Sequence, residues 1–283
     1  MDKKDYINIL SGKSISDISK EIIINQINLF YSISNFILPK NKYNIGDLVY
    51  LKKHTLLHGT FKNLDGLIDI VNNGLISSWF INERISKYPS SVGVWNLKQD
   101  CYLKDYINNY SGGTIKYSGL LKNNEYSQDI KTEIIPYSKM NEITSYVSNN
   151  QSRFWNIEQT KESRFMPSLI QDKVQIGIIF NSDNDYIIKL LKGDILDSNN
   201  INDEIVKDFV NENYYKQFII DRNNKDDLFT DRESAIIFGI PSNFIEGILV
   251  GRIYENDNDI LNKIKLLLPN SYICNLDGKV IRK

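Results

Sequence analysis

The chain has 283 residues, of which 41% are hydrophobic and 24% charged, so it is a folded globular protein and not a disordered one. Its net charge of −1 excludes a broad basic field for nonspecific binding to nucleic acid, although a local basic patch stays open. The two cysteines lie far apart and only two histidines occur, so we expect neither a disulfide framework nor a metal site.

Residues 1–40 are expected to form an N-terminal helical segment, and residues 41–283 one main domain. Apolar residues recur at steps of three and four from Ser16 to Phe36, which predicts one long amphipathic helix that ends before Pro39. We expect this helix to cover the core, with a dimer or partner contact as the alternative. No signal-type apolar core follows Met1 and no run of about 18 apolar residues occurs. A cytoplasmic protein without a membrane partner is therefore expected, and leaderless export stays open.

Two short strands are expected next, over Asp47–Leu51 and Thr55–His58, on either side of a lysine turn in which His54 faces solvent. The second strand ends at a histidine that is followed by Gly59. Because glycine has no Cβ, a polar group of another molecule can come close to the backbone there. The end of this strand is therefore the first candidate for a ligand site.

Two strand-then-helix units organise the first half of the main domain. The first helix has apolar residues at helical spacing over about three turns, with Asn63 as its expected N-cap and Gly74 at its end. The second unit is an apolar strand over Ser90–Trp95, followed by a helix whose apolar face runs from Leu103 to Tyr110.

The second half of the chain contains several expected strands and helices. Val174–Phe180 is apolar on both faces, as in a strand at the centre of a sheet, and Glu233 stands at the entrance of a strand over Ala235–Phe238. A Pro-Ser turn leads to a further strand over Ile248–Val250. We expect helices over 141–149, Asp203–Tyr214 and Asp257–Leu268, a loop or lid over 149–164, and strands around the Asp277-Gly278 turn. Short strands with single helices between them indicate the α+β class.

The segment Leu57-His58-Gly59-Thr60, with the helix behind it, resembles the first motif of ADP-ribosyltransferases of the diphtheria-toxin and poly(ADP-ribose) polymerase type. The resemblance implies a split, mainly antiparallel β-sheet with surrounding helices. It also implies that NAD is held here, with the His58 imidazole at a ribose hydroxyl and the Gly59 backbone at the nicotinamide carboxamide. Thr60 would support the histidine.

The family's second motif is a strand that carries a tyrosine stacked on the nicotinamide. The strand Val92-Gly93-Val94-Trp95 is similar in position, and it offers the indole of Trp95 in place of the phenol. The resemblance thus implies that Trp95 forms one wall of the nicotinamide site. Tyr106, on the helix that follows, is the expected second aromatic wall.

The family's third element is a glutamate that opens a strand near the C-terminus, and Glu233 resembles it. Such a carboxylate bonds the nicotinamide ribose and stabilises the positive charge that develops as nicotinamide leaves, which favours the transition state over the ground state. Glu246 is the rival for this role, although we expect it to close a helical turn at the surface. Asp231 is similar to a loop position that helps to choose the acceptor.

The function that this resemblance implies is NAD-dependent mono-ADP-ribosyl transfer to a macromolecule, with release of nicotinamide and without a metal. A protein is the favoured acceptor because a basic field is missing, and nucleic acid stays open as an acceptor. The setting of an intracellular effector or toxin-like enzyme rests on the same analogy.

Two alternatives remain at this stage. One is an NAD-using RNA 2′-phosphotransferase of the same fold, which would favour clustered arginines, whereas Arg153, Arg164 and Arg232 are scattered along the chain. The other is a non-catalytic module that binds NAD or ADP-ribose, which the missing tyrosine of the second motif permits. The sequence does not decide whether Glu233 or Glu246 is the key glutamate. The acceptor and the oligomeric state also stay open.

Overall fold

The computed structural model describes residues 1–33, 35–60, 62–77, 80, 92–97, 99–110, 114–120, 126–134, 165–166, 175–182, 185–191, 208 and 231–283. In these residues the chain forms six α-helices and a mostly antiparallel sheet, so the predicted α+β class is confirmed. The expected elements over 141–149, 149–164 and 203–214 lie outside the described residues, apart from residue 208.

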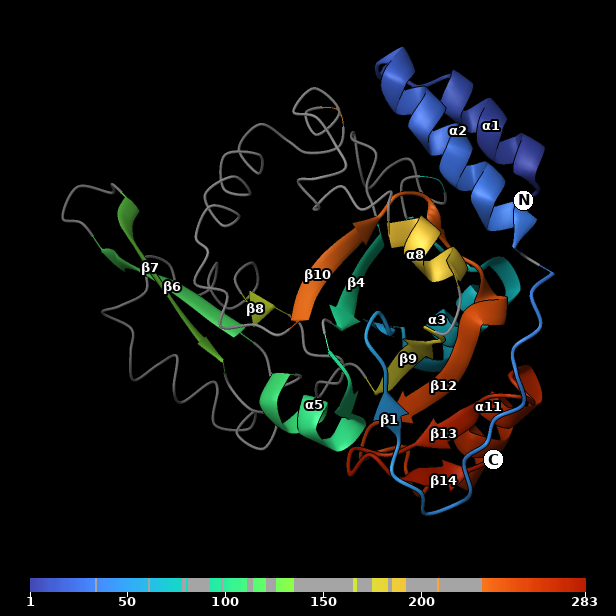
Figure 1. Cartoon of the computed structure of the whole chain (residues 1–283), viewed down its shortest axis with the longest axis vertical. Coiled ribbons are helices and arrows are strands. Elements are labelled where there is room, and N and C mark those ends of the chain that lie inside the picture. The colour runs from blue at the N-terminus through green and yellow to red at the C-terminus, as the bar shows by residue number, and fades with distance from the viewer. Residues whose placement is uncertain are drawn as a thin grey trace.

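The N-terminal segment is a pair of helices, α1 (Lys3–Ser11) and α2 (Asp17–Ser32), which lie side by side at one end of the molecule (Figure 1). The prediction of one helix from Ser16 to Phe36 is wrong in two ways, because α1 was not expected and α2 ends at Ser32. The early end has a tertiary cause. The side-chain amide Nδ2 of Asn243 donates to the carbonyls of Ile33 and Phe36, at 2.9 and 2.8 Å, and so ties this backbone to a distant turn.

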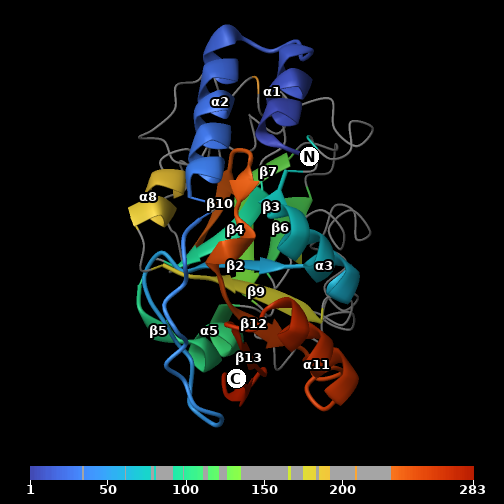
Figure 2. The ribbon, with the colours of Figure 1, turned by 90° about the vertical axis from the view of Figure 1, so that its right-hand side faces the viewer.

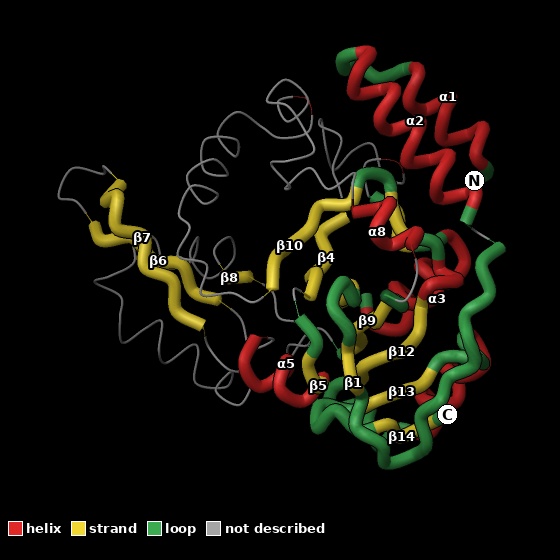
Figure 3. Tube along the Cα trace, in the orientation of Figure 1, coloured by secondary structure: helices red, strands yellow, loops and turns green. Residues whose placement is uncertain are grey.

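Seven strands make the main sheet, and only the β12–β13 pair in it is parallel. Their arrangement can be followed in Figures 1 and 3. The order across the sheet is β10 (Asp231–Ile236), β4 (Val92–Leu97), β2 (Leu56–Gly59), β9 (Ile176–Phe180), β12 (Ile245–Val250), β13 (Tyr272–Cys274) and β14 (Val280–Arg282).

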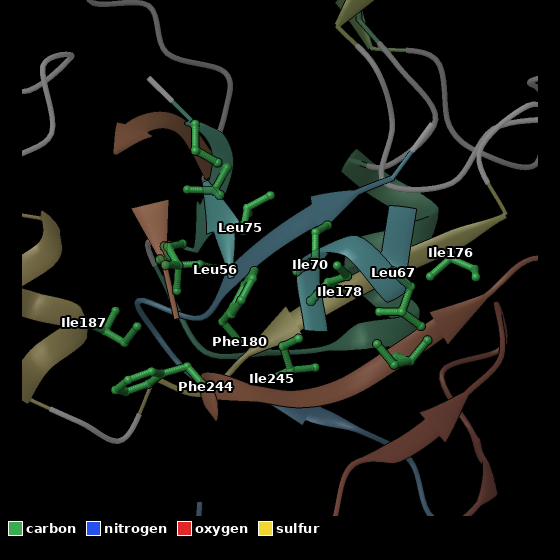
Figure 4. Packing of buried hydrophobic residues seen from close by; sticks show 14 of the residues in the cluster. Leu56, Leu67, Ile70, Leu75, Ile176, Ile178, Phe180, Ile187, Phe244 and Ile245 are labelled. Carbon is green, nitrogen blue, oxygen red and sulfur yellow. The ribbon is translucent and has the colours of Figure 1, made fainter. Parts of the chain in front are cut away.

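The sheet has a separate apolar core on each face. On one face Leu56, Ile178 and Phe180 pack under α3 (Asn63–Asn73), α8 (Asp185–Leu191) and α11 (Asn258–Leu267), as Figure 4 shows in part. On the other face Leu57 and Ile179 pack under α5 (Leu103–Tyr110). Figure 2 shows α3 and α11 on one side of the sheet and α5 on the other. Adjacent residues of a strand point to opposite faces, which explains why Leu56 and Leu57 belong to different cores.

In the part of the chain that the structure describes, further strands form three smaller sheets. The pairs are β1 (Tyr50–Leu51) with β5 (Cys101–Tyr102), and β3 (Leu75–Ile76) with β11 (Gly239–Ile240). The strands β7 (Tyr126–Ile134), β6 (Thr114–Leu120) and β8 (Phe165–Met166) form the third. The strand predicted over Asp47–Leu51 is therefore shorter than expected, and it pairs with β5.

Several local predictions hold at the ends of elements. Gly74 ends α3 with a φ of +85°, and Gly278 turns the chain between β13 and β14 with a φ of +71°. The helix predicted over Asp257–Leu268 is α11, which begins one residue later because Asp257 is its N-cap and accepts hydrogen bonds from the backbone of Asp259 and Ile260. Asn63 is not an N-cap, however, because it is the first residue of α3. Its side-chain Oδ1 accepts instead from the backbone N–H of Gln175 at 2.7 Å.

Two further positions differ from the sequence prediction. His54 is half-buried with a φ of +68°, and its Nδ1 is enclosed rather than solvent-facing. The strand of Glu233 begins at Asp231, so the glutamate lies inside β10 and not at its entrance. In the described residues, no helix is long and apolar enough to cross a membrane.

Candidate functional site

The strands that carry His58, Trp95 and Glu233 are neighbours in the main sheet, although these residues are far apart in the chain. Strand β4 lies between β2 and β10 and is antiparallel to both. The expected first, second and third motifs thus lie on three adjacent strands. Of Trp95 and Glu233 only the backbone positions are described.

The strand register defines two neighbouring rows of residues on one face of the sheet. In the first row, Leu57 pairs with Trp95, and Trp95 pairs with Glu233. In the second row, Gly59 pairs with Gly177, and the same register aligns Gly59 with Gly93, which pairs with Ala235. We call this second row the glycine row (Gly177, Gly59, Gly93 and Ala235). Because three of its members carry no side chain, a ligand can lie close to the sheet beside Trp95 and Glu233.

His58 lies at a position of β2 that alternates with Leu57 and Gly59, so it is out of phase with these two rows. It follows Leu57 in β2 and pairs with Ile178, a core residue of the other face. Side chains alternate between the faces of a sheet, so the register places His58 with Leu56 and Ile178, and it places Glu233 with Gly59 and Trp95. The structure therefore brings Gly59, Trp95 and Glu233 to one face, and it does not bring His58 to that face.

Thr60 is buried, with 5% of its surface exposed, and its backbone N–H donates to the carbonyl of Ile176 at 3.0 Å. Its hydroxyl occupies the space next to Gly66 on α3, where a Cβ would lie 1.9 Å from Oγ1. Thr60 thus fixes the end of β2 against the following helix.

Tyr106 lies in the second core and does not line a site in this structure. Its ring is 1% exposed and packs with Leu57, Leu103 and Ile179 beneath the sheet. The expected role of Tyr106 as the second aromatic wall is thus corrected, because the residues of the core cover its ring.

Glu246 was expected to close a helical turn, and the structure places it in β12 instead. The helical turn η3 (Ser242–Phe244) ends before it. The register between β12 and β9 shifts between Ile245 and Gly247, so Glu246 is the extra residue of a β-bulge. Its Oε2 accepts a hydrogen bond of 2.7 Å from Nδ2 of Asn181.

A pocket lies at this bulge, and we call it the bulge pocket. It is formed by the segment 38–43, by β1, by the end of β9 and by the start of β12, and it has a volume of about 100 Å³. Its polar and aromatic lining includes Lys42, Tyr43, Tyr50, Lys52, Asn181 and Glu246. The sequence analysis missed this pocket, since its walls come from five separate segments, the last of which is Asn270. The one local signal was the alternation of lysine, asparagine and tyrosine in Lys40–Tyr43.

Burial and charge act together on the tyrosines beside Glu246. Burial raises the pKa of Tyr43, and the carboxylate of Glu246 adds to this rise. Burial also raises the pKa of Tyr272 well above its usual value, again with a contribution from Glu246. Both phenols thus stay protonated at neutral pH and can serve as hydrogen-bond donors.

Among the residues that the structure describes, no group of three or more histidine, cysteine, aspartate or glutamate side chains could hold a metal ion. Comparisons with protein-family models, with curated proteins and with solved structures found no match to this chain.

Proposed function

We propose that the chain is an NAD-dependent mono-ADP-ribosyltransferase with the split, mainly antiparallel sheet of that superfamily. The observation that supports the proposal most is the adjacency of β2, β4 and β10, which unites three motifs distant in sequence. The glycine row beside Trp95 and Glu233 adds a surface on which the nicotinamide half of NAD can lie.

The proposed reaction breaks the bond between the nicotinamide nitrogen and C1′ of the attached ribose. Nicotinamide leaves with the bonding electrons, and C1′ becomes cation-like. A nucleophile of the acceptor then forms a bond to C1′ and loses its proton to solvent or to a nearby base. Glu233 stabilises the positive charge at C1′, which lowers the barrier because the charge is largest in the transition state.

The other residues hold the substrate. The Gly59 backbone binds the carboxamide of nicotinamide, and Trp95 provides a ring face. His58 contributes at the end of β2, where Thr60 and α3 fix the backbone. Its register position is out of phase with that of Glu233, which argues against the shared contact of these two residues with one ribose that the resemblance implies. The acceptor is a macromolecule, with protein favoured because the net charge is −1.

The test is the release of free nicotinamide from NAD by the pure protein, with and without a cell extract as the source of acceptor. Glu233→Gln keeps the size of the side chain and removes its charge. We expect it to lower kcat by roughly 10²-fold or more, by analogy with the loss of one oxyanion-hole donor, and to change KM little. Glu21→Gln, an exposed residue of α2, is the matched control and should retain the parent rate.

Three outcomes would contradict the proposal in different ways. No release by the parent protein with either preparation would indicate a non-catalytic module. Removal of a 2′-phosphate from RNA in the presence of NAD would indicate the phosphotransferase. A loss of rate in Glu246→Gln without a loss in Glu233→Gln would move the charge-stabilising role to the rival glutamate.

A further inference from the structure

The bulge pocket brings three kinds of group together at one opening. Its floor carries the carboxylate of Glu246, held by Asn181. Its rim carries the exposed lysines Lys40, Lys42 and Lys52. Beside it stands the exposed ring of Tyr50. The lining thus offers a hydrogen-bond acceptor in Glu246, positive charges in the lysines and an aromatic ring face in Tyr50.

The floor is fixed by the strand geometry. A β-bulge changes the direction in which a side chain leaves its strand, and bulges are frequent next to binding sites. Here the bulge lets Glu246 line the same cavity as Ile179, which belongs to the Leu57 face of the sheet. The carboxylate is only partly exposed, and its bond to Asn181 holds one oxygen in place.

A buried donor also lines the pocket. The side-chain nitrogen Nδ2 of Asn41 is buried and has no hydrogen-bond partner among the described residues. The Oδ1 of the same residue accepts from the backbone of Tyr43 at 2.9 Å, which fixes the amide. A buried donor without an acceptor is costly, and a ligand oxygen would satisfy it.

The aromatic face is held rigidly. Tyr50 is 43% exposed, and its ring meets that of Tyr102 edge-to-face at 5.1 Å between centroids. The hydroxyl of Tyr43 donates to the carbonyl of Tyr50 and accepts from its backbone N–H, at 3.0 and 3.1 Å. Because the backbone of Tyr50 is fixed in this way, its ring can stack a flat ligand with little loss of conformational freedom.

We propose that the bulge pocket binds a ribonucleotide. The ribose lies in the cavity, where its hydroxyls donate to Glu246 and accept from Asn41. The phosphate lies at the lysine rim, and the base stacks on Tyr50, as bases stack on aromatic side chains in single-strand binding sites.

The size of the cavity agrees with this division of the ligand. The volume of about 100 Å³ is smaller than the cavity of about 150 Å³ that encloses a benzene ring, so only part of a nucleotide, such as one edge of the ribose with its hydroxyls, can enter it. The base and the phosphate therefore lie outside, where Tyr50 and the lysines are. A deoxyribose lacks the 2′-hydroxyl, and it would therefore lose a hydrogen bond that the ribose donates to the carboxylate. The site thus distinguishes ribonucleotides from deoxyribonucleotides, in the way that the 2′-hydroxyl usually marks RNA.

A free ribonucleotide and the end of an RNA strand both present a ribose, a phosphate and a base. The site is separate from the one proposed for NAD, and it does not depend on transfer activity. Its test therefore includes His58→Ala, which alters the proposed NAD site and leaves the bulge pocket intact.

The experiment is calorimetric titration of the full chain at low salt with adenosine 5′-monophosphate, its 2′-deoxy analogue, adenosine and a short oligoribonucleotide. We expect the ribonucleotide to bind on the order of tenfold more tightly than the deoxy analogue, the cost of one hydrogen bond to a charged group. Adenosine, which lacks the phosphate, should bind more weakly than adenosine 5′-monophosphate. Added salt should weaken the binding of the monophosphate. If the oligoribonucleotide binds much more tightly than the mononucleotide, the ligand is an RNA strand. If the two bind with equal affinity, the ligand is a free nucleotide.

Matched variants locate the binding. Glu246→Gln should weaken the ribonucleotide about tenfold and abolish the preference over the deoxy analogue. Lys42→Gln, at the exposed rim, should reduce the salt dependence of binding, whereas Lys263→Gln on α11 should change nothing. The proposal is overturned if the parent does not bind the ribonucleotide at millimolar concentration. Equal affinity for the deoxy analogue would overturn it as well. So would binding that His58→Ala removes and that Glu246→Gln and Lys42→Gln preserve.

Discussion

The substitution Gly247→Ala tests why β12 has a glycine next to Glu246. A Cβ at this position would lie 2.3 Å from Cε2 and 2.4 Å from Cζ of Tyr272. The Tyr272 ring is 1% exposed and also meets the ring of Tyr43, so it cannot give way without disturbing the second core. Overpacking of this kind costs about 1–3 kcal/mol, and the gain from alanine over glycine in a strand offsets only about 0.5–1 kcal/mol. We expect a net loss of about 1–2 kcal/mol.

Urea unfolding followed by circular dichroism measures this loss, provided that the slope of the transition is unchanged. Gly12→Ala is the matched control, because the nearest atom to its new Cβ is 3.6 Å away and its φ is −81°. It should change stability by less than about 0.5 kcal/mol. In a Tyr272→Leu background, Gly247→Ala should cost much less than in the parent. An unchanged cost in that background, or no cost in the parent, would refute the ring contact as the reason for the glycine.

Two further predictions concern buried polar groups. The hydroxyl of Tyr272 has no hydrogen-bond partner among the described residues, so Tyr272→Phe should leave stability unchanged or raise it by about 1 kcal/mol in the same assay; a clear loss would contradict this. Burial alone would raise the pKa of Asp208, but hydrogen bonds from Ser16 and Ser19 outweigh it and lower that pKa. The stabilisation is then present above the unfolded pKa of about 3.9 and is lost as the pH falls through the lower folded value. The melting temperature of Asp208→Asn should therefore lie below that of the parent at pH 7 and approach it near pH 3, and a constant difference would exclude this linkage.

The parts of the fold that the sequence predicts well are those with local causes. The helix α5, the central strand β9 and the end of α3 at Gly74 follow from apolar periodicity and from a glycine that adopts a positive φ. The helix α11 follows from the same periodicity, and its N-cap Asp257 accepts from backbone groups two and three residues further along the chain. In each case, the residues that determine the element lie within a few positions of it.

The errors come from contacts between segments that are distant in the chain. Asn63 has the residue type of an N-cap, but its side chain accepts from Gln175 on the way into β9. The end of α2 is set by Asn243, which bonds the carbonyls that follow it. The bulge at Glu246 arises from pairing with β9, so no pattern within β12 indicates it. Periodicity cannot report hydrogen bonds that only the folded chain forms.

The candidate site was predicted in the same partial way. Pattern and resemblance singled out Gly59, Trp95 and Glu233, whose strands are indeed neighbours. Neither could give the phase of His58, because phase depends on how β2 aligns with β4 and β9. The aromatic character of Tyr106 was visible in the sequence, whereas its burial beneath the sheet was not.

The register also relates the two proposed sites to each other. Ile179 of the bulge pocket pairs with Leu57, which begins the row that leads through Trp95 to Glu233, so both sites lie on one face of the sheet. If they bind separate ligands, Glu246→Gln should leave nicotinamide release unchanged, and Glu233→Gln should leave ribonucleotide binding unchanged. If one elongated substrate spans both sites, Glu246→Gln must raise the KM of nicotinamide release as well as weaken ribonucleotide binding, and the ribonucleotide must compete with NAD. The two assays performed on the same two variants therefore separate a transferase with an additional nucleotide site from one with a single extended cleft.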